Sequence, residues 1–587
     1  MRQYASAEVR RNRLVAGALF VLGTMLLGRM GYVQLVRGAA YRVKAASLHI
    51  DSLRLAPERG RILDCWGRPL TLNQTACLVY VWPRKVRNLD SLADILASAG
   101  LGTKEEVRQE IAEHEKMFCF PKRLEQPAAD ALWRRIVKCR FGNCTEVEAE
   151  THRWYPFGPS CSNVVGFVGE DGGLAGLEAW YDSVLSGQPG WVLMQREGLG
   201  LELPYPSYPR VEPVPGADIT LTLDLDVQEL CYRALAAGLE RTGAKHGSAV
   251  VLDAQDGAVL ALASCPSYDP ARFRDFPASR YKCAPVCDEF EPGSSFKIVV
   301  CAAALESPQA EEFVRDRYDV SAGAIEVSGY RISDAHNHGV LDFDGLFTQS
   351  SNPGCAMLAL RLDRTHFYLT AKALGFGEPV GIGLPGEATG RMDKPAKLTA
   401  LRIANNAFGQ GVTVTLLQLA AAYLCIANNG RYVRPYLVRS VRSGNRVLHQ
   451  AGPRPGRQVL APATCARMKE ILAKVVTEGT GTFAAVPGVE VCGKTGTAQK
   501  VEPGGGYSDT RSMMSFVGFL PREPARYVIA VLLDEPNHRF ASTSAGPVFR
   551  EIGEQLLLLE KVRRARMAAG QFPVAGRTEP GMRIAGK

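Results

Sequence analysis

A charge-free apolar run near the N-terminus constrains this chain more than any other feature. The run covers residues 14–28 and directly follows a segment, residues 10–13, that contains three arginines. Fifteen helical residues span only about 22 Å, less than the roughly 30 Å hydrocarbon core of a bilayer. A membrane-crossing helix would therefore continue to Val36, and Arg29 would reach the lipid interface or face a protein partner.

The order of basic flank and apolar run sets the expected orientation. Because positive charges stay on the cytoplasmic side, we expect residues 1–13 in the cytoplasm and residues 14–36 as a single-pass anchor in the inner (cytoplasmic) membrane. Everything later would be extracytoplasmic, in the periplasmic space. A cleaved signal peptide is the alternative, with small residues at 38–40 as its cleavage site. We favour the retained anchor.

Length and composition describe the part of the chain that follows the anchor. At 587 residues the chain is too long for one core, so several domains are expected. Hydrophobic residues make up 46% and charged residues 22%, which is typical of globular domains. The formal charge of +9 is modest, and no dense basic stripe with interleaved aromatic residues precedes the C-terminal tail. Nucleic acid is therefore not an expected partner.

All fifteen cysteines follow the anchor, in a compartment where disulfides can form. Local pairing of Cys139 with Cys144, or of Cys283 with Cys287, stays open, but neither pair has the further cysteines or histidines of a zinc site. We expect no metal and no cofactor. Four cysteines lie within apolar runs and are predicted to be buried as small hydrophobic side chains: Cys301, Cys355, Cys425 and Cys492.

The first half of the chain, residues 37–215, alternates short apolar runs with turns. We interpret it as a mixed, irregular domain with one charged helix at residues 103–116. Four prolines between residues 205 and 216 predict a stiff linker at its end.

The second half, residues 216–560, has clearer periodicity. A strand-like pattern at 219–223 and a helical one at 225–241 precede a hairpin whose strands, 248–252 and 258–262, flank an Asp-Gly turn. A second strand pair, 515–520 and 527–533, follows a helical middle. Because strand pairs bracket the helices, we predict an α+β fold in which an antiparallel sheet is flanked by helices. Residues 561–587 are basic and rich in glycine and proline, and we predict a disordered tail.

Three short motifs occur in order in this second half. They are Ser294–Lys297 (SxxK), Ser350–Asn352 (SxN) and Lys494–Gly496 (KTG). Each alone is weak, because Ser279–Lys282 and Ser443–Asn445 match the first two patterns as well. Context favours the Ser294 match, since it follows a Pro-Gly turn and precedes an apolar helical run, whereas the second SxN match reads as a hairpin turn.

The spacing of Ser294 and Lys297 has a chemical consequence. Residues three apart share a helix face, which predicts the Lys297 ammonium beside the Ser294 hydroxyl. A serine becomes a good nucleophile when a base takes its proton, and a lysine can be that base if burial or a second cation lowers its pKa. Lys494 is the candidate second cation. An exposed lysine beside a helix-start serine is the alternative for an isolated motif.

The motif set resembles that of the penicillin-binding proteins and serine β-lactamases. Longer blocks support the likeness, and those from 291–297, 406–412, 494–499 and 515–519 look like transpeptidase sequence. Upstream blocks resemble the pedestal (dimerisation-type) domain of class B members: residues 57–64, 153–158 and 176–178. The chain departs from the commoner pattern at Cys65-Trp66, where an arginine often follows the aspartate, and at Pro353.

The resemblance implies a peptidoglycan D,D-transpeptidase that cross-links stem peptides ending in D-Ala-D-Ala and is acylated by β-lactams. Ser294 would attack the penultimate D-Ala carbonyl, and Lys297 would take its proton. Ser350 would relay the proton to the leaving amine, Asn352 would hold the donor peptide, and Lys494 would keep the field positive. The family needs no cofactor.

Substrate binding is implied for Thr495, Gly496 and Thr497, with the two threonines on the terminal carboxylate of the donor peptide. The backbone N–H groups of Ser294 and Thr497 would form the oxyanion hole, which is worth about 3 to 4 kcal/mol per donor.

Alternative functions use the same fold. A D,D-carboxypeptidase would let water resolve the acyl-enzyme, and a β-lactam sensor or non-catalytic scaffold would need no turnover. The pedestal and anchor favour the transpeptidase, and thirteen cytoplasmic residues are too few for a sensor's output domain. A glycosyltransferase domain is not evident, so a polytopic SEDS-family polymerase is the expected membrane partner, within the divisome or elongasome. The Ser-Ser-Asn motif and compact pedestal favour the division type.

Overall fold

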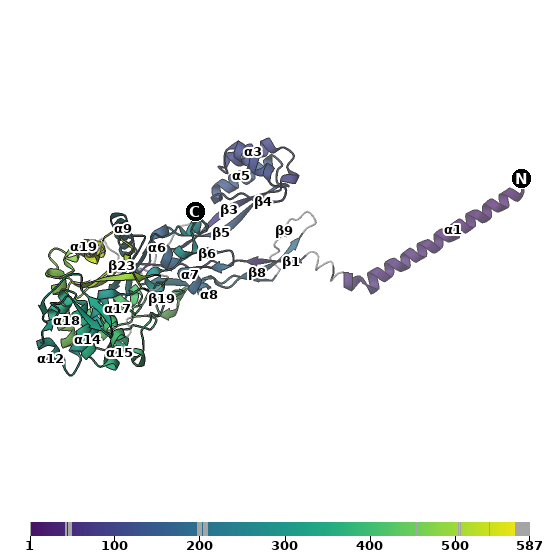
Figure 1. Ribbon diagram of the computed structural model, residues 1–587. Coiled ribbons are helices and arrows are strands. Elements are labelled where there is room, and N and C mark those ends of the chain that lie inside the picture. Colours follow the sequence, from purple (N-terminus) through teal and green to yellow (C-terminus); the bar gives the residue numbers. More distant parts are fainter. Residues whose placement is uncertain are drawn as a thin grey trace. The chain divides into compact units, whose positions relative to one another are not determined.

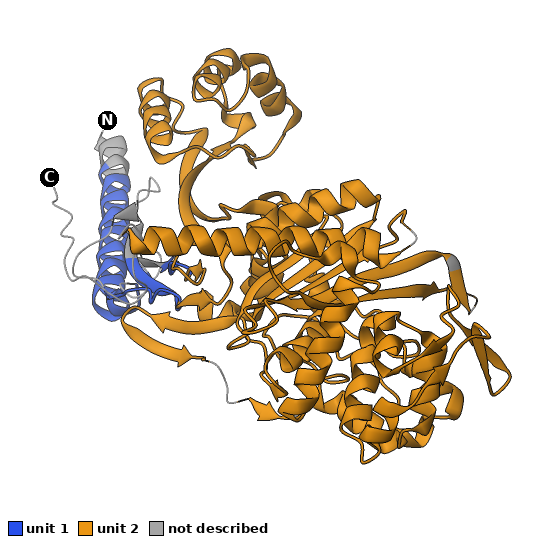
Figure 2. Cartoon of the chain, turned by 90° about the vertical axis from the view of Figure 1, so that its left-hand side faces the viewer, with its two compact units in different colours: residues 1–59, 186–216 blue, residues 60–185, 217–587 orange. Residues whose placement is uncertain are grey.

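A computed structural model describes residues 2–41, 44, 50–196, 202–203, 209–452, 456–502, 504, 506–538 and 540–569. The chain divides into two compact units (Figure 2). Unit 1 comprises Met1–Arg59 and Ser186–Gly216, and unit 2 comprises Gly60–Leu185 and Ala217–Lys587.

Unit 1 begins with a long apolar helix, α1 (Arg2–Gly31), which continues as a π-helical turn, Tyr32–Val36. Among the described residues, Val9–Val36 is the one segment long and apolar enough to cross a membrane. The rest of unit 1 is a small sheet in which β8 (Gly190–Arg196) pairs with β1 (Ile50–Leu55), β9 (Glu202–Leu203) and β10 (Arg210–Val211), all antiparallel.

The prediction of a stiff linker at residues 205–216 is wrong for the part of this range that pairs in the sheet. Residues 210–214 pair back onto residues 188–192, through β10 and an isolated bridge between Gln188 and Val214. Gly190 permits the approach, because a Cβ there would lie 2.2 Å from the Val211 carbonyl oxygen. The prolines therefore bound a strand, and residues 204–208 lie outside the described part.

Unit 2 contains a head subdomain, residues 72–154, with its own core. Its sheet has the order β4-β3-β5 and is covered by three helices. The predicted charged helix is α4, which begins after a capping box between Thr103 and Glu106. The elements of the head are β3 (Leu72–Val81), α3 (Leu89–Ser98), α4 (Lys104–Glu113), β4 (Phe118–Cys119), α5 (Gln126–Lys138) and β5 (Thr145–Trp154).

The main sheet of unit 2 is antiparallel, with the order β13-β12-β24-β23-β22. Both predicted hairpins are present, and Gly257 takes the left-handed conformation (φ 76°) that its turn requires. The strands are β12 (His246–Asp253), β13 (Val259–Cys265), β22 (Cys492–Val501), β23 (Tyr507–Leu520) and β24 (Tyr527–Asp534). The α+β prediction is therefore confirmed.

Alternating side chains let the sheet bury both faces. On one face, Ala249 and Val251 pack against α9 (Leu225–Thr242) and α19 (Ala541–Ala568). On the other, Val250 and Leu252 pack in the larger core that contains α11 (Lys297–Leu305), α17 (Leu416–Ala427) and α18 (Pro462–Thr477). Figure 1 shows α9 and α19 beside each other and α17 across β23 from them.

The helical middle supplies the remaining elements around the larger core. They are α12 (Ala310–Arg315), β14 (Tyr318–Asp319), β15 (Ala324–Val327), β16 (Tyr330–Ser333), β17 (Val340–Leu341), α13 (Phe343–Thr348), α14 (Asn352–Arg361), α15 (Arg364–Ala373), α16 (Ala400–Asn406), β18 (Arg431–Tyr432) and β21 (Arg457–Gln458). The second SxN match is the turn between β19 (Val438–Ser443) and β20 (Arg446–Gln450), with Gly444 left-handed, as predicted.

A further mixed sheet, β2-β11-β19-β20, joins the start of unit 2 to the second half of the chain. β2 (Ile62–Leu63) runs parallel to β11 (Asp218–Leu221). Beside it, Arg153 and Glu178 form a buried ion pair of 2.7 Å, which links two of the upstream family-like blocks. Short elements complete this region: α6 (Gly158–Val165), β6 (Val168–Gly169), β7 (Gly172–Gly173), α7 (Gly176–Trp180), α8 (Asp182–Leu185) and α10 (Ala284–Cys287).

The C-terminal segment is helical over part of the range for which disorder was predicted. Helix α19 runs to Ala568, so the prediction of disorder is wrong for residues 561–568, and residues 570–587 lie outside the described part. The reason is an ion-pair network that basic composition alone does not reveal. The Arg563 guanidinium bonds both Asp224 (2.5 and 2.8 Å) and Asp226 (2.5 Å).

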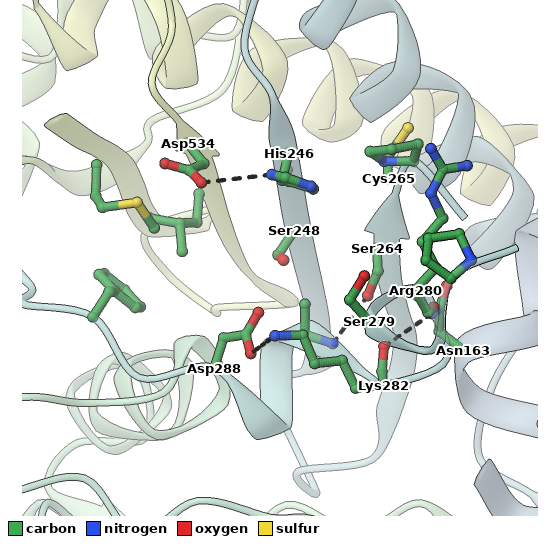
Figure 3. Close-up of a pocket in the computed structure, with 17 residues that line it drawn as sticks. Asn163, His246, Ser248, Ser264, Cys265, Ser279, Arg280, Lys282, Asp288 and Asp534 are labelled. Carbon is green, nitrogen blue, oxygen red and sulfur yellow. Dashed lines mark hydrogen bonds and ion pairs between the residues drawn. The ribbon is translucent and has the colours of Figure 1, made fainter. Parts of the chain in front are cut away.

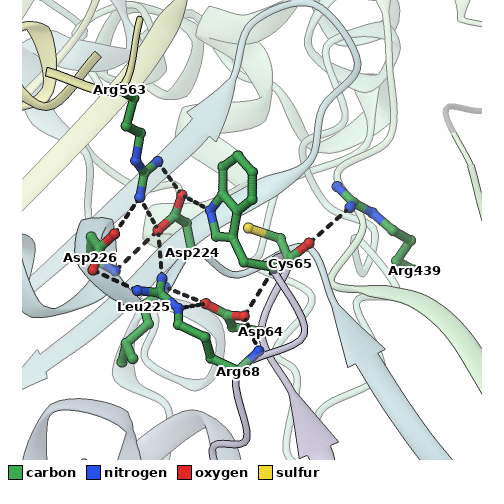
Figure 4. Close-up of polar contacts among 9 residues, drawn as sticks. Asp64, Cys65, Arg68, Asp224, Leu225, Asp226, Arg439 and Arg563 are labelled. Carbon is green, nitrogen blue, oxygen red and sulfur yellow. Dashed lines mark hydrogen bonds and ion pairs between the residues drawn. The ribbon is translucent and has the colours of Figure 1, made fainter. Parts of the chain in front are cut away.

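The network extends to the first hairpin of unit 2 (Figure 4). Arg68 bonds Asp64 at 2.7 Å and Asp226 at 2.8 Å. The pKa of the Asp226 carboxyl is lowered. Burial alone would raise this pKa, but hydrogen bonds from Arg68 and Arg563 lower it more. We call Asp64, Arg68, Asp224, Asp226 and Arg563 the aspartate–arginine cluster. In it each carboxylate has at least one guanidinium partner.

Asp64, Cys65 and Asp224 also bring potential metal-ligand atoms within 4.8 Å of one another. Arg68 and Arg563 already occupy the two carboxylates, and Trp66 Nε1 donates to Asp224 at 2.9 Å. Burial raises the pKa of the Cys65 thiol, which keeps it protonated. The group is therefore a poor site for a cation.

All fifteen cysteines lie in the described part of the chain, and all are free. The four predicted to be buried are buried, so that prediction is confirmed. Cys139, at the end of α5, is the one cysteine classed as exposed. The local pairs that the sequence left open are not formed.

Candidate active site

Ser294 lies on a short 3₁₀ turn, Gly293–Phe296, that leads into α11. Gly293 has φ 55°, and a Cβ there would lie 2.4 Å from the carbonyl oxygen of Thr497. Gly409 approaches equally closely, because its Cβ would lie 2.2 Å from the Gly293 oxygen. Two glycines thus let β22 and the 406–412 block pack directly against the turn that carries Ser294.

Lys297, the first residue of α11, is 1% exposed. Its ammonium donates to the Ser350 carbonyl oxygen at 2.6 Å, to the Ser350 hydroxyl at 3.2 Å and to Asn352 Oδ1 at 2.8 Å. Burial lowers the pKa of Lys297, and no carboxylate of the described residues lies within ion-pair distance of its ammonium. The neutral amine is therefore favoured more than in a solvated lysine.

Among the described residues, the hydrogen bonds of Lys297 do not include Ser294, the neighbour that the SxxK spacing predicts. Within the described part of the chain, the hydrogen bonds of Lys297 go to Ser350 and Asn352 and none goes to Ser294. Instead, the segment 350–352 offers three acceptors to the three ammonium protons.

Ser350 connects the two lysines of the site. Its hydroxyl accepts from Lys297 at 3.2 Å and from Lys494 at 2.8 Å. Its backbone is left-handed (φ 61°), which is uncommon for a residue with a Cβ and is retained where the surroundings fix it. This conformation leaves the Ser350 carbonyl oxygen as an acceptor for Lys297.

Lys494 enters the site from β22 and is 1% exposed. Burial lowers its pKa well below the usual value, and the charge of Lys297 lowers it further. Besides Ser350, it donates to the Thr495 carbonyl oxygen (3.4 Å) and hydroxyl (3.3 Å). We call Lys297, Ser350 and Lys494 the lysine cluster.

The proposed substrate-binding residues lie along β22, the strand at one end of the main sheet. Thr497 is exposed, whereas Thr495 is buried and its hydroxyl lies 3.0 Å from that of Thr480. Gly496 is required by close packing, because a Cβ there would lie 2.4 Å from Ser515 Oγ and 2.6 Å from the Pro292 oxygen. The structure thus brings all eight predicted site residues to one region.

Two residues of this region were not identified from the sequence. Thr480 contacts Thr495, and Asp334 accepts hydrogen bonds from the Ser351 hydroxyl and the Asn352 backbone N–H, each of 2.6 Å. Asp334 lies in an irregular, polar connection, where an aspartate is an ordinary turn residue. Its sequence surroundings contained no signal for this contact.

The other SxxK match lies in a separate cavity of about 490 Å³ (Figure 3). Its lining includes residues at the ends of β12 and β13, several residues between 277 and 290, and Met513 and Asp534 of β23 and β24. Lys282 is half exposed and pairs with Asp288 at 2.5 Å. Lys297, by contrast, is buried, and burial lowers its pKa, so the comparison supports the choice of Ser294 as the nucleophile.

Fold and site together define a penicillin-recognising serine transpeptidase domain. Residues 247–554 match the family described as "Penicillin binding protein transpeptidase domain", and residues 54–221 match "Penicillin-binding Protein dimerisation domain". The chain therefore belongs to the penicillin-binding proteins, and the dimerisation domain places it in class B. The family prediction is confirmed.

Comparisons with individual proteins agree with this family assignment. The chain is 34% identical over 555 residues to stage V sporulation protein D of Bacillus subtilis, covering 92% of this chain and 85% of the relative. It is 33% identical to penicillin-binding protein PbpB of Mycolicibacterium smegmatis, with 94% and 91% covered. The crystal structure of penicillin-binding protein 3 from Mycobacterium tuberculosis, complexed with aztreonam, superimposes with a TM-score of 0.67 at 28% identity, covering 87% of this chain and 98% of that one.

Proposed function

We propose that this protein is a serine-type peptidoglycan D,D-transpeptidase. One observation carries the proposal: the Ser350 hydroxyl lies between two buried lysines, beside the turn that presents Ser294. A relative from Mesostigma viride, 30% identical over 581 residues, is named a peptidoglycan D,D-transpeptidase FtsI homolog. The substrate would be a stem peptide that ends in D-Ala-D-Ala.

In the first step, the Ser294 oxygen attacks the carbonyl carbon of the penultimate D-Ala. The neutral Lys297 amine takes the hydroxyl proton, for which its lowered pKa prepares it. The oxyanion would be held by the backbone N–H groups of Ser294 and Thr497, and the close packing of Gly293, the residue before Ser294, on Thr497 supports this pairing.

In the second half of this step, the bond to the terminal D-Ala breaks and its nitrogen needs a proton. The hydrogen-bonded path from Lys297 through Ser350 supplies it, with Lys494 keeping the potential positive. Asn352 would hold the donor peptide. Thr495 and Thr497 would bind its terminal carboxylate, and Gly496 would keep the strand close to Ser294.

The acyl-enzyme is then resolved by the amine of a second stem peptide, which attacks the ester carbonyl and regenerates Ser294. Water in place of that amine would give the D,D-carboxypeptidase alternative. A β-lactam would acylate Ser294 in the same way, because its strained amide resembles the D-Ala-D-Ala bond.

The cellular setting is also a proposal. We infer that α1 anchors the chain with residues 1–13 in the cytoplasm and the catalytic domain outside, in the wall compartment. A SEDS-family glycosyltransferase of the division machinery would polymerise the glycan strands. The names of the relatives, which include PbpB and an FtsI homolog, support the division role over the elongation role.

Acylation can be tested on the full chain in detergent. Intact-protein mass spectrometry after incubation with a penicillin should show one adduct, mapped to Ser294, and Ser294→Ala should show none while remaining folded. An adduct on another residue would refute the assignment. Release of D-Ala with dimer formation from stem-peptide substrates distinguishes the transpeptidase from the carboxypeptidase.

Orientation can be tested by protease treatment of spheroplasts. The region after Val36 should be digested and residues 1–13 protected. The reverse pattern would contradict the proposed topology.

A further inference from the structure

Asp334 lies outside the three motifs, in the connection between β16 and β17, and both of its carboxylate oxygens are engaged at the start of α14. Oδ2 accepts from the Ser351 hydroxyl and Oδ1 from the Asn352 backbone N–H, each at 2.6 Å. Ser351 is the N-cap of α14, and its own oxygen accepts from the Gly354 N–H at 3.1 Å. The carboxylate therefore fixes two consecutive residues of the SxN motif.

These two residues adjoin the acceptors of Lys297. The ammonium donates to the Ser350 carbonyl oxygen and to Asn352 Oδ1, which flank Ser351 on either side. Ser350 is in the left-handed conformation, which its neighbours must maintain. From the α13 side, the Ser351 N–H donates to the Leu346 oxygen at 2.9 Å. From the opposite side, the fixing contacts come from Asp334.

We propose that Asp334 is a positioning residue for the acylation step, because it holds residues 350–352 in the shape that receives the Lys297 ammonium. It does not touch the reacting atoms. The proposal rests on the proposed function and deepens it, since it adds a residue that none of the three motifs contains.

The charge of Asp334 should also act on Lys297. Burial lowers the pKa of Lys297, while Cys355 and Asp334 oppose that shift. Among the described residues, the titratable groups that act on the ammonium are Lys494 from β22, Cys355 from α14 and Asp334 from the β16–β17 connection. Removing the carboxylate charge should therefore lower the pKa of Lys297 further, and the rising limb of the acylation rate against pH should move to lower pH.

The test uses Asp334→Asn in the full chain in detergent. The amide keeps an acceptor for the Asn352 N–H but loses the charge and the acceptor for the Ser351 hydroxyl. The second-order rate of acylation by a fluorescent penicillin, measured from pH 5 to 10, should fall at least tenfold near neutral pH. The midpoint of its rising limb should shift to lower pH. The acylation rate of Asp334→Ala should fall further.

Asp319→Asn is a matched control. The Asp319 carboxylate accepts from the hydroxyl and the N–H of one residue, Ser321, at 2.5 and 3.0 Å, so it has the same kind of hydrogen bonds away from the lysine cluster. This variant should acylate at the wild-type rate. Should Asp334→Ala fail to fold, Ser351→Ala serves instead, and a smaller fall in the same direction is expected.

An unchanged rate and an unchanged pH profile in Asp334→Asn would overturn the proposal. An equal fall in Asp319→Asn would do so too, because it would show a general effect of loop carboxylates. Failure of the proposed function is recognised separately, by labelling that persists in Ser294→Ala.

Discussion

Unit 2 contains two groups of charged side chains with opposite compositions. In the aspartate–arginine cluster, three carboxylates and two guanidiniums alternate, and Asp64 and Asp224 are almost fully buried (Figure 4). In the lysine cluster, two ammoniums share one serine hydroxyl without a carboxylate at ion-pair distance among the described residues. The first arrangement stabilises charged groups, and the second leaves them destabilised.

The difference separates a structural role from a chemical one. Opposite charges in contact stabilise each other and connect segments, here the first hairpin, α9 and the end of α19. Like charges in a buried site favour loss of a proton, which is what a general base requires. Lys469 sharpens the contrast, because it is as buried as the site lysines but pairs with Glu523 at 2.7 Å.

The largest effect is expected for Lys297→Arg. Arginine keeps the positive charge but holds its proton at any physiological pH. Acylation by penicillin should therefore fall by about 10³-fold, the range for loss of a positioned base. The rate is measured with a fluorescent penicillin.

Lys282→Arg, in the other SxxK match, is the control and should acylate normally. Wild-type acylation by Lys297→Arg would refute the role of Lys297 as the base. If the variant loses acylation but still supports cell-wall growth in a depletion strain, the scaffold alternative would replace the enzymatic one.

The next largest effect tests the opposite cluster. Arg563→Ala leaves Asp224 with one remaining guanidinium partner, and breaking such a buried pair costs about 3 kcal/mol. Urea denaturation should show that loss, while the folded fraction should acylate at the wild-type rate. Truncation after Glu560, which removes Arg563, should lower the stability by a similar amount. A loss of acylation without a loss of stability would show that the cluster has a direct part in the chemistry.

A smaller effect of opposite sign is expected for Lys494→Met. The folded pKa of Lys494 is lowered well below its usual value, so between the two values the unfolded chain binds more protons and stability rises with pH. Methionine removes that dependence and the buried charge. The variant should be more stable than the wild type by about 1 to 2 kcal/mol near neutral pH, yet slower in acylation. Calorimetry at pH 6 and pH 9 measures both the gain and the slope.

Lys469→Met provides the matched comparison, because it removes a buried lysine that has a carboxylate partner. It should destabilise the fold. If both methionine variants change stability in the same direction, the distinction between the two kinds of buried charge is wrong.

Local sequence patterns predicted the elements that depend on neighbouring residues. The hairpin around Gly257 follows from its Asp-Gly turn, and α11 follows from the apolar run after Lys297. The motifs identified the eight site residues through a family resemblance, and the structure brings these residues together.

Contacts between distant segments were not predictable in this way. Local spacing placed Lys297 against Ser294, but its partners lie 53 and 55 residues away. Composition predicted a disordered tail, whereas the partners of Arg563 lie 337 and 339 residues upstream. The role of Asp334 could not be predicted for the same reason, because its partners lie 17 and 18 residues away. Periodicity reports which face of an element is buried and does not name the partner.

The accessibility of the cysteines offers a practical tool for spectroscopy. Cys139 is exposed at the end of α5 in the head subdomain, while the other fourteen thiols are buried or half buried. Burial raises the pKa of many of these, including Cys161 to about 12, which leaves little reactive thiolate. A maleimide dye should therefore label the unmodified protein at one place. With a fluorescent penicillin as the second dye, energy transfer would report the distance between the head and the acylated serine.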